Sequence, residues 1–283
     1  MMQRIIVTDS TSDLDPSYLK KHGIHVIPLS VTINGKSYED QTDISSEDYI
    51  NYLGDDSYDL KTSQPPLGMF VEKYEELAKD DVEIISIHLT SGLSGTVQTA
   101  RQASEMVDGK ITVIDSKFIA WGLGYQIQYL VKWIEQGVPT EEILKKLEKL
   151  QKNIKLYVVI GQLDQLIKGG RISKTKGFLG NLMKIKPIGE LVDGKLEMIH
   201  NVRTQSACVK QLVNDLKPFA DGAKLESVGI SHADAEDFMS KVKDKLDETF
   251  EVGSFQLSHT SPVISTHTGK GAIGLIVLKE DTY

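Results

Sequence analysis

A turn rich in hydroxyl groups, Thr90-Ser91-Gly92-Leu93-Ser94-Gly95-Thr96, lies between an apolar segment and a helical pattern. Residues 84–89 predict a short buried strand, and Ala100, Ala103 and Val107 have the spacing of one helix face. Backbone N–H groups and hydroxyls at the start of a helix favour a bound anion. A simple helix cap needs only one Ser or Thr, so the additional hydroxyls favour an anion-binding turn.

Three other segments that we expect to be loops carry hydroxyl, carboxylate or imidazole groups: Asp9–Asp13, Thr62-Ser63 and Ser265–Thr268. The second half of the chain adds the cations Arg171 and Arg203. Sites in parallel sheets form at the carboxyl ends of the strands, so Asp9–Asp13 should lie close to the turn. A few hydroxyls and one cation suit a carboxylate better than a triphosphate. The alternatives are ordinary turn chemistry for each loop and a solvated surface for the two arginines.

The common enzyme motifs are absent from the sequence. No phosphate-binding Gly-x-x-x-x-Gly-Lys motif occurs, and a nucleophile elbow would need glycine where Thr96 stands. The seven histidines do not have metal-ligand spacing with each other or with Cys208, so we predict no metal site. A catalytic role stays open, but no group of residues indicates one.

The composition is that of an ordinary globular protein, and its net charge of −8 argues against a general nucleic-acid or membrane-surface binder. The single cysteine, Cys208, excludes an internal disulfide and favours a reducing compartment. No signal segment or membrane-spanning stretch is found. We therefore expect a cytoplasmic protein.

Strands alternate with helices in the first half, which predicts a mostly parallel sheet covered on both faces. The expected strands are 4–8, 25–33, 84–89 and 111–115. Helices are expected after Asp15, Ser45 and Pro66 and at 121–135 and 140–150, and residues 61–66 should form an extended loop. Asn34-Gly35 is a strong turn signal.

The pattern changes near Asn153, where we place the end of a first α/β domain, residues 1–153, and the start of a second, residues 154–283. The second contains a predicted hairpin around Asp193-Gly194 and therefore a mixed or antiparallel sheet. Its other expected strands are 156–160, 227–231, 254–258 and 272–278. Its helices are expected at 177–183, 204–216 and 235–250.

Five motifs together resemble the DegV family over essentially the whole chain. They are Val7–Asp13, Thr62-Ser63-Gln64-Pro65, Leu89–Thr96, Gly169-Gly170-Arg171-Ile172 and His267-Thr268-Gly269. The resemblance implies a two-domain α/β protein that holds a long-chain fatty acid between its domains. It implies a non-enzymatic carrier that presents this ligand to a fatty-acid kinase, which makes an acyl phosphate for phospholipid synthesis. No cofactor is implied.

The resemblance also implies site residues. Thr62, Ser94 and His267 match the family's carboxylate-binding positions, and Ser91 is a further candidate. Gly92 departs from the family, since serine is expected there in many relatives, and this leaves the role of Ser91 open. Arg171 matches the family's Gly-Gly-Arg arginine and, with Arg203, is a candidate contact for the head group or the partner.

A buried acyl chain needs an apolar wall, for which the candidates are Phe178, Leu179, Leu182 and Met183, although an ordinary core helix explains them equally well. About 14 methylene groups give on the order of 11 kcal/mol of gross burial energy, at about 0.8 kcal/mol each. A hydrogen bond to a charged group contributes roughly 1.5–3 kcal/mol, so the tail should dominate affinity. One alternative function is an enzyme that acts on a small carboxylated or phosphorylated metabolite with His267 as acid–base; another is a regulatory module.

Overall fold

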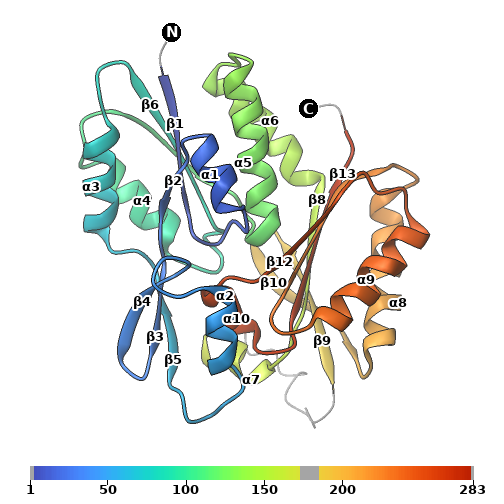
Figure 1. The fold of residues 1–283 in the computed structure, drawn as a ribbon. Coiled ribbons are helices and arrows are strands. Elements are labelled where there is room, and N and C mark those ends of the chain that lie inside the picture. The colour runs from blue at the N-terminus through green and yellow to red at the C-terminus, as the bar shows by residue number, and fades with distance from the viewer. Residues whose placement is uncertain (1–2, 173–184, 282–283) are drawn as a thin grey trace.

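Figure 1 shows the computed structural model of the chain, which describes residues 3–172 and 185–281. The described strands form three sheets of four, six and three strands. The first half of the chain, coloured blue to green, forms the four-stranded and three-stranded sheets. The second half, yellow to red, forms the six-stranded sheet beside them.

The four-stranded sheet is entirely parallel, with the order β2-β1-β6-β7. These strands are β1 (Gln3–Asp9), β2 (His25–Ile27), β6 (Val82–His88) and β7 (Lys110–Asp115). Every residue of β6 is buried, as expected for a central strand covered on both faces.

Helices cover both faces of this sheet. On one face, α3 (Leu67–Leu77) and α4 (Thr96–Ser104) pack their buried side chains, Phe70 and Ala100 among them, against Val7 and Ile84. On the other face lie α1 (Pro16–Lys21), α5 (Ala120–Glu135) and α6 (Thr140–Lys152). The predicted helices at 121–135 and 140–150 and the helix after Pro66 are therefore confirmed.

The six-stranded sheet has the order β10-β9-β8-β13-β11-β12, and its pairs are antiparallel except for β11 with β12. Its strands are β8 (Ile154–Val159), β9 (Lys186–Val192), β10 (Lys195–Val202), β11 (Leu225–His232), β12 (Phe255–His259) and β13 (Ile273–Lys279). Asp193 and Gly194 form the turn of the β9–β10 hairpin, as predicted. The α/β fold with one parallel and one mixed sheet is confirmed.

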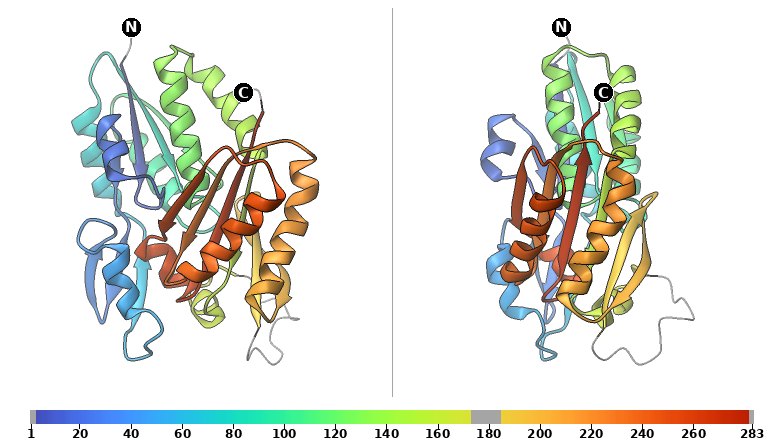
Figure 2. Two further views of the ribbon diagram at one scale, coloured as in Figure 1. Left: turned by 45° about the vertical axis from the view of Figure 1, so that its right-hand side comes forward. Right: turned by 90° about the vertical axis from the view of Figure 1, so that its right-hand side faces the viewer.

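The two faces of the six-stranded sheet have different partners. Figure 2 shows α8 (Gln205–Ala220) and α9 (Glu236–Thr249) on its outer face, where they enclose a core that includes Cys208 and Phe238. The inner face contributes Leu156, Val158 and Ile276 to a large core shared with α5, α6 and the first half of the chain. All described strands before residue 153 lie outside this sheet; the domain division at 153 stays a prediction.

The third sheet corrects two predictions. Residues 25–33 are not one strand, because β2 ends at Ile27 and β3 (Ser30–Ile33) joins a separate antiparallel sheet with the order β4-β3-β5. Residues 61–66 are not a loop throughout, because Thr62 lies in β5 (Leu60–Ser63), opposite Val31. The partner strand β4 (Lys36–Glu39) follows the predicted Asn34-Gly35 turn.

Short helices lie where the sheets meet. They are α2 (Ser46–Tyr49), the 3₁₀ turn η1 (Ile50–Tyr52), α7 (Leu163–Lys168) and α10 (Pro262–Thr268). Ser265–Thr268 was expected to be a loop, but Ser261 accepts a hydrogen bond from Ile264 N–H and Pro262 sets the first turn of α10. The predicted helix 177–183 lies outside the described residues. Among the described residues, no helix combines the length and the apolar character needed to cross a membrane.

Candidate functional site

An apolar cavity of about 60 Å³ lies between the sheets. Leu29 and Leu89 line it from the first half of the chain, and Leu156, Val158 and Leu191 line it from the second. Its polar lining comes from Thr62, Ser63, Gln64, Ser94, Arg171, His267 and Thr268. The structure therefore brings together four predicted site residues, Thr62, Ser94, Arg171 and His267.

A hydrogen bond between Thr62 and His267 joins β5 to α10 in the polar part of the cavity lining. Oγ1 of Thr62 lies 2.8 Å from Nε2 of His267. Burial, and then the nearby charge of Arg171, lowers the pKa of His267 to about 4. The imidazole is therefore neutral near pH 7. Its buried Nδ1 has no hydrogen-bond partner among the described residues.

The Gly-Gly-Arg segment holds this imidazole closely. A Cβ at Gly169 would lie 2.3 Å from His267 Nδ1, so only glycine leaves room for the ring. Arg171 donates through Nε to the carbonyl oxygen of Leu93 at 3.2 Å and through Nη1 to the carbonyl oxygen of Gly169. These bonds place a fixed positive charge between the hydroxyl-rich turn and α10.

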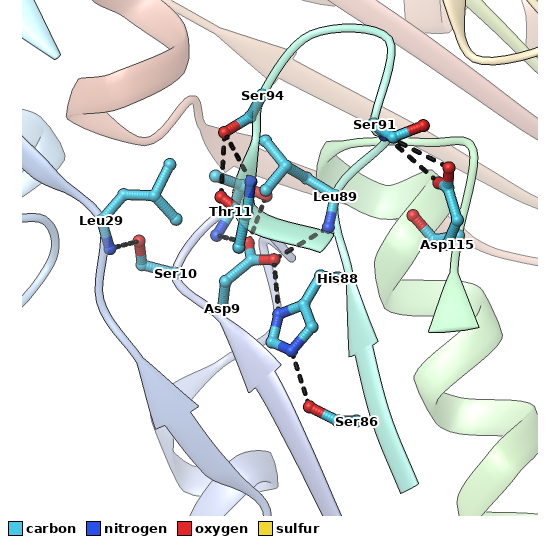
Figure 3. A network of polar contacts seen from close by, with 12 residues as sticks. Asp9, Ser10, Thr11, Leu29, Ser86, His88, Leu89, Ser91, Ser94 and Asp115 are labelled. Atoms are coloured by element: carbon cyan, nitrogen blue, oxygen red, sulfur yellow. Dashed lines mark hydrogen bonds and ion pairs between the residues drawn. The ribbon is translucent and has the colours of Figure 1, made fainter. Parts of the chain in front are cut away.

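The turn presents Ser94 to the cavity and directs Ser91 away from it. Ser94 Oγ lies 2.9 Å from Thr96 Oγ1 and accepts the Thr96 N–H at the start of α4. Ser91 is exposed and does not line the cavity, and its N–H points to the carboxylate of Asp115 (Figure 3). Of the two serines, only Ser94 is therefore placed to meet a ligand in the cavity.

The tip of the β9–β10 hairpin explains the glycine at position 92. Thr90 Oγ1 donates to the carbonyl oxygen of Gly194 at 2.8 Å. A Cβ at Gly92 would approach that same oxygen to 2.1 Å, so serine would not fit this packing. The hairpin thus holds the start of the turn in place.

A buried chain of hydrogen bonds supports the turn from below (Figure 3). Tyr74 donates to Ser86 at 2.7 Å, Ser86 Oγ lies 2.7 Å from His88 Nε2, and His88 Nδ1 lies 3.2 Å from Asp9. Asp9 also accepts the N–H of Leu89 at 2.8 Å. The order Ser–His–Asp is that of a hydrolase triad. All three side chains are fully buried, however, and the oxygen of Ser86 already accepts a hydrogen bond from Tyr74. This series of hydrogen bonds therefore orients the backbone of the turn.

Two further carboxyl groups are buried where the halves of the chain meet. Asp13 accepts hydrogen bonds from Ser231 and Ser258 of the six-stranded sheet, and Asp40 accepts one from Ser10 at 2.6 Å and one from the N–H of Val263. Burial raises the pKa of Asp13 and of Asp40 to about 7. Sequence reasoning missed this role of both residues, because their burial depends on contacts between distant segments.

Strand pairing brings together two histidines whose spacing in the sequence gave no metal signal. His232 and His259 are register partners on β11 and β12, with ring centroids 4.4 Å apart. One ligand atom of each lies within 4.8 Å of the other and of a Glu236 carboxylate oxygen. Nδ1 of His232 already accepts the N–H of Ala235, so Nε2 of the neutral ring carries the proton and offers no lone pair to a metal in this arrangement. The absence of a metal site stays a prediction.

The remaining predicted residues lie elsewhere. Arg203 is exposed between β10 and α8, and it lines neither this cavity nor the polar cleft described below. Phe178, Leu179, Leu182 and Met183 lie outside the described residues. Sequence reasoning missed the wall that the structure does describe, and the apolar runs 84–89 and 156–160 were the available signal.

The fold and the site define a two-part α/β protein with an apolar cavity that ends in polar groups. Residues 4–280 match the family model described as "Uncharacterised protein, DegV family". The chain belongs to the DegV family, as its motifs indicated.

Named relatives agree in sequence and in fold. The chain is 59% identical over 280 residues to a DegV domain-containing protein of Staphylococcus aureus (strain COL), with 99% of this chain and 100% of that protein covered. A fatty-acid-binding DegV family protein from Thermus thermophilus superposes with a TM-score of 0.91 at 28% identity, covering 99% and 100% of the two chains. DegV of Bacillus subtilis, a fatty acid binding protein, superposes with a TM-score of 0.89 at 30% identity and the same coverage.

Proposed function

We propose that this protein binds a long-chain fatty acid without modifying it. The observation that carries the proposal is the apolar cavity that ends at the Thr62–His267 pair and Arg171. The fatty-acid-binding relatives of the same fold support it. The acyl chain lies along the apolar wall, and the carboxylate lies at the polar end.

The polar end suits a single carboxylate. Thr62 and Ser94 supply hydroxyl donors, and Arg171 supplies a positive charge already oriented by Leu93 and Gly169. Hydrogen bonds to an ionised carboxylate are stronger than those between neutral groups. Since His267 is neutral near pH 7, it adds a hydrogen-bonding group without a second full charge.

The cavity must widen when a long chain enters. Its volume of about 60 Å³ is well below the roughly 150 Å³ of an engineered cavity that holds one benzene molecule. Because the two walls come from different halves of the chain, a small separation of the sheets enlarges the cavity along its length. Closure around the ligand then adds apolar contacts that the free protein lacks.

A second opening near the carboxylate supports presentation to a kinase. A polar cleft of about 330 Å³ shares Thr62, Arg171 and His267 with the cavity, and Lys61 and Lys168 lie along it. We propose that a fatty-acid kinase reaches the bound carboxylate through this cleft and forms the acyl phosphate. The carrier itself then supplies no catalytic group.

The alternative of an enzyme that uses His267 as acid–base has less support. An efficient general acid or base has a pKa near the working pH, whereas the pKa of His267 lies near 4. A small polar metabolite would also leave the leucine-lined part of the cavity unoccupied.

The proposal is tested on protein purified from a bacterial host. Mass spectrometry after denaturation should detect a co-purified fatty acid, and protein stripped of lipid should take up palmitate or oleate. A lipid-free preparation that takes up neither acid would refute binding. The kinase step is tested separately: loaded protein, kinase and ATP should give acyl phosphate, and protein that binds acid but never supports this reaction would instead be a regulatory module.

A further inference from the structure

A second, smaller cavity continues the first one away from the carboxylate site. We call it the end chamber; the main cavity shares part of its lining, and the rest comes from Ala120, Ser231, Thr260, Ala272, Ile273, Gly274 and Ile276. The shared residues are Ile119, Leu156, Val158, Ile264 and Thr268. The two cavities thus lie on either side of the same side chains.

The lining of the end chamber does not include the polar end of the main cavity. None of Thr62, Ser94, Arg171 and His267 lines it. Its volume of about 20 Å³ exceeds the roughly 10–15 Å³ needed for a single water-sized group, so it has room for one methyl group. Aliphatic side chains, alanines and a glycine make up most of its lining.

The room in the chamber comes from the missing side chain of Gly274. This residue pairs with Val158 on one side and Ser231 on the other, in the middle of the sheet. Its strand neighbours Ile273 and Leu275 pack outward against the core under α8 and α9, so position 274 faces inward, toward the chamber.

The backbone at this position does not require glycine. A Cβ built on Gly274 would lie 3.5 Å from Ile276 Cδ1 and 3.9 Å from the Ser231 carbonyl oxygen, which are ordinary contacts. By contrast, a Cβ at Gly229, on the neighbouring strand β11, would lie 2.5 Å from the Trp121 ring. Gly229 is therefore needed for packing, whereas Gly274 leaves unfilled space.

We propose that the end chamber receives the terminal methyl group of the acyl chain and that position 274 sets the longest chain that fits. This inference rests on the proposed fatty-acid binding. A larger side chain at 274 would fill the chamber and stop a long chain short of its full depth. A shorter chain, which does not reach the chamber, would bind as before.

The test compares wild type, Gly274→Ala and Gly274→Val, each stripped of lipid, with dodecanoic, tetradecanoic, hexadecanoic and octadecanoic acids in a displacement assay. For the longest acids, Gly274→Val should lose affinity about four-fold for each methylene group that no longer fits, which corresponds to about 0.8 kcal/mol. Its affinity for dodecanoic acid should not change. Gly274→Ala should show a smaller loss of affinity for the longest acids. It replaces Gly274→Val in the test if the valine variant does not fold.

Leu257→Val is the control, since Leu257 is exposed on β12 of the same sheet and lines no part of the chamber. This variant should keep the wild-type affinities for all four acids. Equal losses for all four acids, or unchanged profiles in both glycine variants, would overturn the inference about the chamber. If the wild-type protein bound none of the acids, the proposed function itself would fail, so the two failures are distinguishable.

Discussion

At the scale of single residues, the two serines of the turn provide a matched pair. Replacing Thr62 or Ser94 with alanine removes a donor that faces the cavity, and we expect fatty-acid binding to weaken by about 1–3 kcal/mol. Ser91→Ala changes an exposed hydroxyl outside the cavity and should leave the affinity unchanged. Calorimetric titration of lipid-free protein measures all three variants. A loss for Ser91→Ala as large as that for Ser94→Ala would contradict this assignment.

The buried carboxyl of Asp13 predicts a pH effect on stability. Its pKa rises from 3.8 to about 7 on folding, so the folded protein binds the proton more tightly than the unfolded chain. The resulting stabilisation is present below pH 3.8 and is lost as the pH rises through about 7. Asp13→Asn cannot ionise and does not share this loss.

Thermal unfolding of Asp13→Asn and wild type across this pH range tests the effect. The melting temperature of the variant minus that of wild type should become more positive as the pH rises. His267, whose lowered pKa makes stability fall as the pH drops from 6.5 toward 4, is present in both proteins and cancels in the difference. A difference that does not change with pH would show that Asp13 ionises normally.

The residues near the carboxylate site could be predicted because hydroxyls, arginine and histidine stand out in short motifs. The contacts that these residues make with one another could not be predicted. The contact of Thr62 with His267 depends on β5 and α10 meeting, and the contact of His232 with His259 depends on strand register. Leucines such as Leu29 and Leu191 line the cavity but carry no sequence feature that distinguishes them from other core residues.

At the scale of elements, the buried hydrogen bonds that link Tyr74, Ser86, His88 and Asp9 should hold β6 and the turn in place. Asp9→Ala would leave the N–H of Leu89, both donors of Thr11 and the ring of His88 without their acceptor. Each buried donor left without an acceptor costs about 1–3 kcal/mol, so chemical denaturation should show a loss of stability of several kcal/mol, roughly 3 or more.

Asp115→Ala is the matched control, because Asp115 accepts backbone N–H groups at the same edge of the sheet but bonds to exposed residues. Asp115→Ala should lower the free energy of unfolding by less than about 1 kcal/mol, as is typical of surface substitutions. Similar losses in the two variants would mean that the buried chain adds little to the stability of the turn.

Periodicity and turn signals predicted the long helices, most strands of the two larger sheets, the turn at Asn34-Gly35 and the hairpin around Asp193-Gly194, but not strand β4. They did not predict where residues 25–33 divide, because the apolar pattern continues while the chain passes from one sheet to another. They also placed Ser265–Thr268 in a loop. Three of these four residues are buried, so packing outweighs the low intrinsic helix preference of Ser and Thr.

At the scale of the whole molecule, a ligand that joins the two halves should stabilise both. A fatty acid at 100 times its dissociation constant adds about 2.7 kcal/mol to the folded state, which should raise the melting temperature by several degrees. The methyl ester of the same acid keeps the tail but lacks the charge, so it should give a smaller shift. Equal shifts for acid and ester would mean that the polar end contributes nothing to binding.

The separation of Thr62 and His267 along the chain has a consequence for the timing of synthesis. The two residues are 205 positions apart, and ribosomes add roughly 5–20 residues per second, so His267 follows Thr62 by about 10–40 s. During that interval the parallel sheet can assemble before Leu156, Val158 and Leu191 of the opposite wall have been made. A newly made molecule therefore completes the Thr62–His267 pair only when α10 has been made, so we expect that it cannot be loaded while its first half is being translated.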